Sequence, residues 1–214
     1  MLRSNGRNAQ LQEWYERLED LVSTTQAGLA GEAALEVARR SGCALDAEGA
    51  LRLTFFRRPY TVHPPTYAVQ EQGKEPSPFT QSLILAYLAT ADGTPPSARW
   101  ISYHDLPGGQ FYARAFRGYA ENRLVHDLGW RGVDAFHAAA ERLDGVPIGI
   151  GSASYAFPIL PRLHLAAVYW PGDEELSAQA SILFEESAPH YMSTDGLAVL
   201  GSHLVGAIVE AAKG

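Results

Sequence analysis

The sequence holds a single cysteine, Cys43, among 214 residues. One thiol cannot form an internal disulfide, a thiolate zinc site or an iron–sulfur cluster, so the chain by itself excludes all three. It also starts without the apolar run that marks a secretory signal peptide. These absences lead us to expect a cytoplasmic protein.

Long runs of like charge are missing too, although the net charge is -7. Proteins that bind nucleic acid or anionic membranes present clustered lysine and arginine, and this sequence has no such block. We therefore expect neither nucleic acid nor a membrane among its partners.

The common catalytic signatures are absent as well. There is no P-loop pattern, no His-Glu-x-x-His, no Gly-x-Ser-x-Gly and no paired cysteine motif. Gly149 and Gly151 resemble part of a dinucleotide fingerprint, but they lack its third glycine and lead into a predicted strand, where that motif needs a helix. None of the seven histidines has metal-ligand spacing, so no metal site is predicted.

What the sequence does contain is a globular composition, with 46% hydrophobic and 19% charged residues. Such a chain can bury enough apolar surface to offset the conformational entropy lost on folding. The length fits one ordinary domain. We expect a single α+β domain over residues 1–214, with residues 1–30 as a helical appendage.

Hydrophobic periodicity predicts both element types. Apolar residues recur at helical spacing between Leu11 and Val22, and a second helix is predicted at 32–40, ending at Ser41-Gly42. Further helices are predicted at 78–91, 110–117, 121–128 and 133–143, and a closing helix begins at Ser193 or Thr194. Strands are predicted at 51–56 and 60–62, joined by a turn at 57–59, and at 67–69, 98–103, 152–160, 163–170 and 180–184. The fold class is α+β, an antiparallel or mixed sheet with helices packed on it and an N-terminal helical segment.

One stretch could form an anion-binding pocket. Gly108 and Gly109 would let backbone N–H groups at a helix start approach an anion, and Arg114 and Arg117 follow on that predicted helix. Arginine offers a planar fork of donors that suits carboxylate or phosphate. Aromatic rings from Trp100 and Tyr112 would complete the pocket; the alternative is a tight turn followed by solvated arginines.

Two histidines could contribute to a ligand site. His164 is expected on a strand face with Ala166, Val168 and Trp170, and His63 lies in a loop stiffened by the prolines that follow it. The alternatives are a hydrogen-bonded core histidine for His164 and an exposed loop histidine for His63.

Other reactive side chains favour a structural interpretation. The acidic runs 173–175 and 185–186 follow predicted strands, where solvated turn charges are the more common role than acid and base pairs. Cys43 has no histidine near it in sequence and is expected to be a small buried residue.

Five phrases between about residue 35 and residue 210 carry a resemblance to a known family: RSGCALD, LRLTFFRRPYTV, LILAYLATADGTPPSARWISYHDLPGGQFYARAF, FPILPRLHLAAVYWPGDEE and SILFEESAPHYMSTDGLAVLG. The most specific part runs from Trp100 to Phe116. Together they resemble a domain family of unknown function found mainly in anaerobic bacteria and archaea. Some members carry an appended 4Fe-4S cluster domain, which implies a setting among anaerobic redox or one-carbon cofactors. This chain departs from those members, because one cysteine cannot ligate such a cluster. Any redox role would therefore need a separate partner protein or a cofactor that is not bound by cysteines.

Three functions stay open at this point. The first is a module that binds a small anionic metabolite or a cofactor, for instance a tetrapyrrole or flavin, whose identity the sequence does not give. The second is an enzyme on a small anionic substrate, with Arg114 and Arg117 positioning it and His164 or His63 moving protons. The third is an accessory protein that binds a redox partner through an apolar patch.

Overall fold

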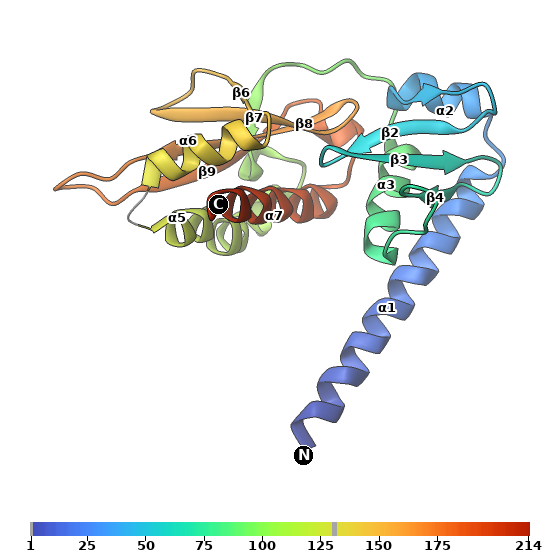
Figure 1. The fold of residues 1–214 in the computed structure, drawn as a ribbon, viewed down its shortest axis with the longest axis horizontal. Coiled ribbons are helices and arrows are strands. Elements are labelled where there is room, and N and C mark those ends of the chain that lie inside the picture. Colours follow the sequence, from blue (N-terminus) through green and yellow to red (C-terminus); the bar gives the residue numbers. More distant parts are fainter. Residues whose placement is uncertain (1, 130–131) are drawn as a thin grey trace. The chain divides into compact units, whose positions relative to one another are not determined.

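The computed structural model describes residues 2–129 and 132–214, and the side chains from residue 12 onward within those ranges. Contacts within the chain divide it into two compact units, residues 1–93 and 94–214, which we call the N-terminal and C-terminal units (Figure 1). Each is described by itself. Whether they form the single domain expected from the sequence stays a prediction.

The N-terminal unit combines three helices with a small antiparallel sheet. The helices are α1 (Leu2–Leu29), α2 (Ala34–Ser41) and α3 (Pro78–Thr90), and α1 packs along α3. The sheet has the order β1-β2-β3-β4. Its strands are β1 (Ala44–Leu45), β2 (Leu51–Phe55), β3 (Arg58–His63) and β4 (Ala68–Gln70). Both the hairpin and the helix opened by Ser77, whose hydroxyl accepts the Thr80 N–H, are confirmed.

Two details of this unit differ from the sequence prediction. The hairpin turn lies at Phe56-Arg57, both at positive φ, so Arg58 and Pro59 belong to the second strand rather than to the turn. Helix α1 also continues through the Thr-, Gly- and Ala-rich residues 23–29, because Val22 and Leu29 are buried beside the rest of the unit. Tertiary packing outweighs the weak local propensity there.

The C-terminal unit is a five-stranded antiparallel sheet with helices on one face. Its strand order is β5-β9-β8-β7-β6. The strands are β5 (Trp100–Ser102), β6 (Val146–Pro147), β7 (Ala153–Leu160), β8 (Leu163–Trp170) and β9 (Gln179–Glu185). The helices are α4 (Ala113–Phe116), α5 (Asn122–Leu128), α6 (Gly132–Arg142) and α7 (Thr194–Ala211), and the shorter helical turns are η1 (Tyr103–Asp105), η2 (Gly109–Phe111), η3 (Arg117–Glu121) and η5 (Ala188–His190).

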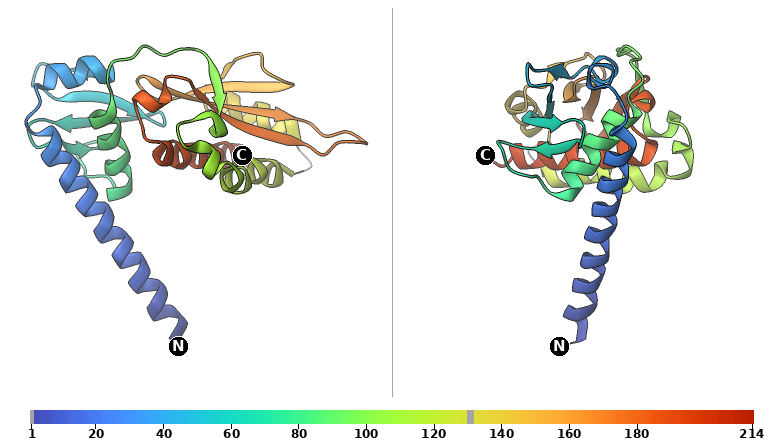
Figure 2. Two further views of the ribbon diagram at one scale, coloured as in Figure 1. Left: turned by 180° about the vertical axis from the view of Figure 1, so that it is seen from behind. Right: turned by 90° about the vertical axis from the view of Figure 1, so that its right-hand side faces the viewer.

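Cross-strand register assigns the two faces of this sheet. Residues of β7, β8 and β9 such as Tyr155, Tyr169 and Ile182 face the helices: Phe136 of α6 stacks on Tyr169 with ring centroids 5.7 Å apart, and a Cβ on Gly201 of α7 would come within 3.4 Å of Ile182. Figure 2 shows the closing helix α7, in red, running below the orange strands of this sheet in its left-hand view. The alternate residues, which include His164 and Glu185, face the other way. The α+β class with an antiparallel sheet is thus confirmed.

The stretch between β5 and α5 departs most from the sequence prediction. Strand β5 starts only at Trp100, since Ala98 has a φ of 53° and is not extended. The helix expected at 110–117 is interrupted at Tyr112, whose φ and ψ of -116° and 0° are not helical. From Ala113 the chain runs through α4, the π-helical turn η3 and α5 to Leu128.

No helix in residues 2–129 or 132–214 combines the length and the apolar character needed to cross a membrane.

Candidate functional site

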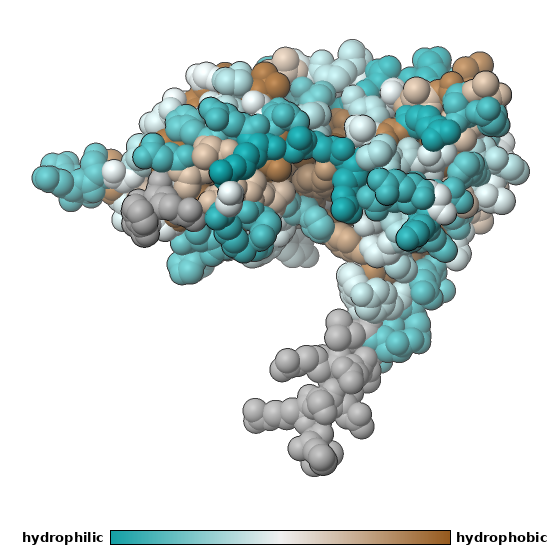
Figure 3. Space-filling model, viewed as in Figure 1, coloured by the Kyte–Doolittle hydropathy of each residue, from teal (hydrophilic) through white to brown (hydrophobic). Residues whose placement is uncertain are grey.

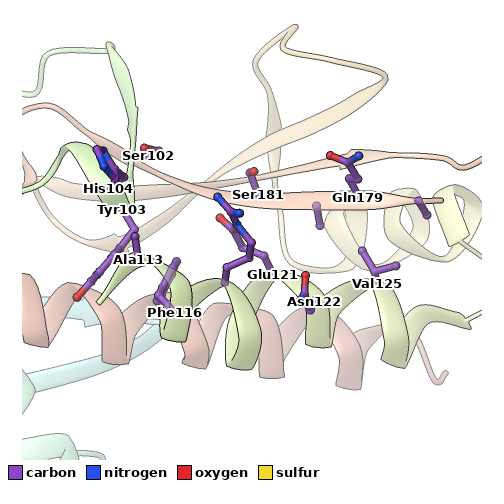
Figure 4. A pocket seen from close by; sticks show the side chains of 13 residues that line it. Ser102, Tyr103, His104, Ala113, Phe116, Glu121, Asn122, Val125, Gln179 and Ser181 are labelled. Carbon is purple, nitrogen blue, oxygen red and sulfur yellow. The ribbon is translucent and has the colours of Figure 1, made fainter. Parts of the chain in front are cut away.

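A pocket of about 430 Å³ opens in the C-terminal unit. Three segments line it: residues 102–104 at the end of β5, the helical stretch between Ala113 and Val125, and residues 178–181 at the start of β9. Figure 4 shows Ser181 and Gln179 on the strand that runs above the helix carrying Glu121, Asn122 and Val125. A volume of this size suits a small metabolite.

Packing of aromatic rings fixes the wall of the pocket. Phe116 is buried and stacks on Tyr103, with ring centroids 4.4 Å apart, and it also lies 5.9 Å from Phe184 of β9. The turn before it is equally constrained, since a Cβ on Gly109 would lie 1.9 Å from the Tyr103 carbonyl oxygen. Only glycine fits there, so the chain can pass close to Tyr103 and bring the helix to the sheet.

Glu121 is the most buried charged side chain of the pocket. Its side chain is 11% exposed, and its Oε1 accepts the backbone N–H of Ile182 at 3.2 Å. Strand β5 pairs with residues 183–185 of β9 only, so the carboxylate takes over as the hydrogen-bond acceptor where that neighbouring strand stops. Burial raises the pKa of Glu121, and this outweighs the lowering by the Ile182 N–H and by Arg117.

Arg117 is the cation beside this carboxylate. Its Nε lies 3.6 Å from Oε2 of Glu121, which is an ion pair but too long for a hydrogen bond, and its side chain is 70% exposed. The guanidinium therefore keeps its donors available at the pocket. Other polar residues at the pocket are His104, whose Nδ1 lies 3.4 Å from Asp105, and Asn122 on the helix. Ser102, Gln179 and Ser181 line it from the strands, where alternation turns their side chains to the sheet face opposite the helices.

A second polar group lies on the sheet face away from the helices. Trp100 of β5 is opposite Glu185 of β9, and the β8–β9 register places His164 on the other side of Glu185. Glu185 is buried, and its Oε2 lies 3.3 Å from Nδ1 of His164, whose side chain is 32% exposed. Trp100 and His164, both predicted as ligand contacts from the sequence, therefore lie in one cross-strand row on either side of Glu185.

The remaining sequence candidates do not meet at the pocket. Tyr112 and Arg114 are exposed and do not line it. Gly108 and Gly109 form a tight turn in which the Gly109 N–H donates to the Leu106 carbonyl, so the anion cradle expected at the helix start is not formed. His63 belongs to β3 of the N-terminal unit and contacts Gln70 across the strand pair at 3.2 Å. Of the predicted set, only Arg117 lines the pocket.

The sequence analysis does not identify Glu121 as a site residue, because no sequence pattern indicates that its side chain is buried. The only local signal is the i,i+4 spacing of Arg117 and Glu121, which on most helices is a surface pair. The residues of β9 could not be found either, because they reach the pocket by pairing with β5 about eighty positions earlier in the chain.

The other reactive groups have structural roles. Cys43 is buried, and burial raises its pKa to about 11. The 173–175 run lies in the exposed turn between β8 and β9, where Asp173 accepts the Glu175 and Leu176 N–H groups, and this projecting tip is hydrophilic in Figure 3. Within the described part of the chain, no cluster of three or more His, Cys, Asp or Glu could hold a metal ion.

Comparison with known proteins gives one result. The model of a family described as "Domain of unknown function (DUF3786)" matches residues 34–207, so the chain belongs to that family. No curated protein and no solved structure matches the chain. The resemblance seen in the sequence is confirmed at the level of the family, whereas its range of organisms and the appended 4Fe-4S domain stay predictions.

Proposed function

We propose that this member of the DUF3786 family binds a small anionic metabolite or cofactor in the pocket of its C-terminal unit, with Arg117 as the main contact to the anion. The observation that carries the proposal is the division of roles between Arg117 and Glu121. The carboxylate is buried and committed to the Ile182 N–H, while the guanidinium lies open at the pocket. Arginine in such a position offers two parallel donors to a carboxylate or phosphate.

The lining residues add selectivity to this contact. On the helix side, Asn122 supplies an amide group and Tyr103 and Phe116 supply an apolar aromatic wall, while Ser102, Gln179 and Ser181 line the pocket from the strands. Pockets for small ligands commonly combine an apolar wall with a few polar groups that fix orientation. The arrangement therefore favours a ligand with an anionic group and a neutral polar or planar body.

A binding experiment with two arginine variants tests the proposal. Succinate, citrate, inorganic phosphate and adenosine monophosphate would be titrated into the protein by calorimetry. Arg117→Ala should weaken binding of the ligands that bind by about tenfold or more, the effect of losing a charge-assisted hydrogen bond. Arg114→Ala is the matched control, because it removes the same charge from the same helix without lining the pocket. Equal losses in both variants would show a general charge effect and contradict the proposal.

Proton transfer at His164 is a second candidate. Glu185 contacts Nδ1 of His164, so a neutral imidazole that donates from this atom keeps Nε2 as an acceptor, the arrangement used by many general bases. Under this alternative the protein is an enzyme on a small anionic substrate. Activity that survives His164→Gln would remove it.

The cellular setting comes from the sequence. A cytoplasmic protein in an anaerobic redox or one-carbon context, with a redox partner protein as a third possible function, stays a prediction. A visible absorption spectrum and the native mass of protein purified without oxygen would test it, since a bound tetrapyrrole or flavin adds both colour and mass.

A further inference from the structure

The pocket lies along an unpaired strand edge. Strand β5 covers β9 only at residues 183–185, so the preceding residues of β9 have strand β8 on one side and the pocket on the other. Since Ile182 donates its N–H to Glu121, away from β8, strand geometry turns the N–H and C=O of Ala180 toward the same side. No backbone group of the described residues pairs with Ala180 from there.

Glu121 caps this edge at Ile182, and the residues of β9 before that point lack the usual sequence features that prevent pairing. Natural edges carry lysine, proline or a bulge that prevents pairing with another strand. Residues 178–181 have none of these, and the neighbouring side chains of Ala113, Ala178 and Ala180 are small. The pocket of about 430 Å³ lies beside this part of the edge.

We propose that the ligand of this pocket is an extended peptide segment that adds to the edge of β9 beyond the end of β5, with a carboxylate reaching Arg117. This inference rests on the proposed function and names the class of its anionic ligand. One peptide residue opposite Ala180 would exchange two backbone hydrogen bonds with it, as in other cases of strand addition. A C-terminal carboxylate, or an acidic side chain of the peptide, would bind the guanidinium of Arg117.

The probe for the test is a library of fluorescein-labelled pentapeptides with free carboxyl termini. Binding to the full chain would be followed by fluorescence anisotropy, and the tightest member would be remade with N-methyl groups at alternate residues. N-methylation removes the donors needed for strand addition and should weaken binding about tenfold or more. Equal binding of the N-methylated peptides in both registers would overturn the inference.

A protein variant gives the reciprocal test. Ala180→Pro removes the N–H that faces the pocket and no hydrogen bond to β8, so the fold should be retained, as proline is tolerated on an open edge. Peptide affinity should fall about tenfold or more, and Arg117→Ala should lower it similarly while Arg114→Ala leaves it unchanged. Should Ala180→Pro fail to fold by circular dichroism, the N-methylated peptides decide.

Small anions separate this inference from the proposed function. If succinate or phosphate binds in an Arg117-dependent manner and no library peptide binds below millimolar concentration, the peptide inference fails and the proposed function stands. If neither anions nor peptides bind, both fail.

Discussion

Among the described arginine–glutamate pairs of the two units, one in each unit has a partner that is less than one fifth exposed, and these two pairs distribute burial in opposite ways. In the N-terminal unit Arg40 is 16% exposed and donates to both carboxylate oxygens of Glu32, while its Nη2 also donates to the Leu88 carbonyl at 3.1 Å. In the C-terminal unit the arginine, Arg117, is 70% exposed and the carboxylate of Glu121 is buried.

The difference separates a structural pair from a binding pair. Arg40 joins the residues before α2 to the end of α3, so the donors on its Nη1 and Nη2 serve the fold. In the second pair it is the carboxylate that serves the fold, through Ile182, and the guanidinium is left for a ligand. The identity of the buried partner in an ion pair therefore indicates function better than the existence of the ion pair does.

Exchanging each of the two arginines for alanine tests the comparison between the pairs directly. Arg40→Ala should lower the free energy of unfolding by about 2 kcal/mol, because it leaves the partly buried Glu32 and the Leu88 carbonyl without their donor. Arg117→Ala should change it by no more than about 0.5 kcal/mol, as expected for an exposed side chain. Urea unfolding followed by circular dichroism measures both. A similar loss in the two variants would remove the distinction between the pairs.

A pair of glycine variants tests what holds the pocket wall. Gly109→Ala places a Cβ against the Tyr103 carbonyl and should cost about 2 kcal/mol or more, because backbone must move. Gly108→Ala, at a φ of 73° with open space around it, should cost about 1 kcal/mol. Thermal unfolding should rank them in that order. The reverse order would mean that the close approach to Tyr103 does not position the helix.

Replacing the buried carboxylate of Glu121 should strengthen anion binding by Arg117. Glu121→Gln removes the charge that competes for Arg117, so sulfate binding at pH 7 should tighten by about threefold. In the unmodified protein the raised pKa of Glu121 means that it takes up a proton at higher pH than a free carboxyl does. Sulfate affinity should therefore rise as the pH falls toward the folded-state pKa of Glu121, and this rise should flatten in Glu121→Gln.

Controls separate this carboxyl from its neighbours. His104 also lines the pocket, so the titration would be repeated in His104→Asn. The raised pKa also makes the proton on Glu121 stabilising: its contribution is present at low pH and is lost as the pH rises through the folded-state pKa. An unchanged pH dependence in Glu121→Gln would contradict the assignment.

The smallest effect is expected at the lone thiol of the N-terminal unit. Burial and a pKa of about 11 leave Cys43 as a thiol at neutral pH, so iodoacetamide should label the folded protein far more slowly than the urea-unfolded chain. Mass spectrometry of the intact protein follows the reaction. Rapid labelling of the folded state would show that this part of the unit opens readily.

Local features of the fold could be predicted from the sequence, and long-range ones could not. Short-range sequence patterns predict the β7–β8 hairpin, the helix caps at Ser77 and Ser193, and the closing helix. The turn at Phe56-Arg57 carries no glycine or asparagine to mark its positive φ angles. The pairing of β5 with β9 joins distant segments, and no periodicity within either strand specifies its neighbour.

The candidate site follows the same division. Arg117 was found from its residue type and its place after a glycine turn. Glu121 and the β9 residues became visible only once the sheet brought them beside the helix. The sequence predicts that Gly109 belongs to a ligand-binding turn, whereas in the structure its missing side chain allows the close approach to Tyr103.

The central claim, that Arg117 is the anion contact of the C-terminal unit, is tested most directly by nuclear magnetic resonance of protein labelled with ¹⁵N-arginine. Phosphate and succinate would be titrated while the Nε–H signals of Arg117 and Arg114 are followed, each assigned by its alanine variant. We expect the Arg117 signal to shift along a saturable curve while that of Arg114 stays in place. Equal, unsaturated shifts of both signals, or no shift of either, would contradict it.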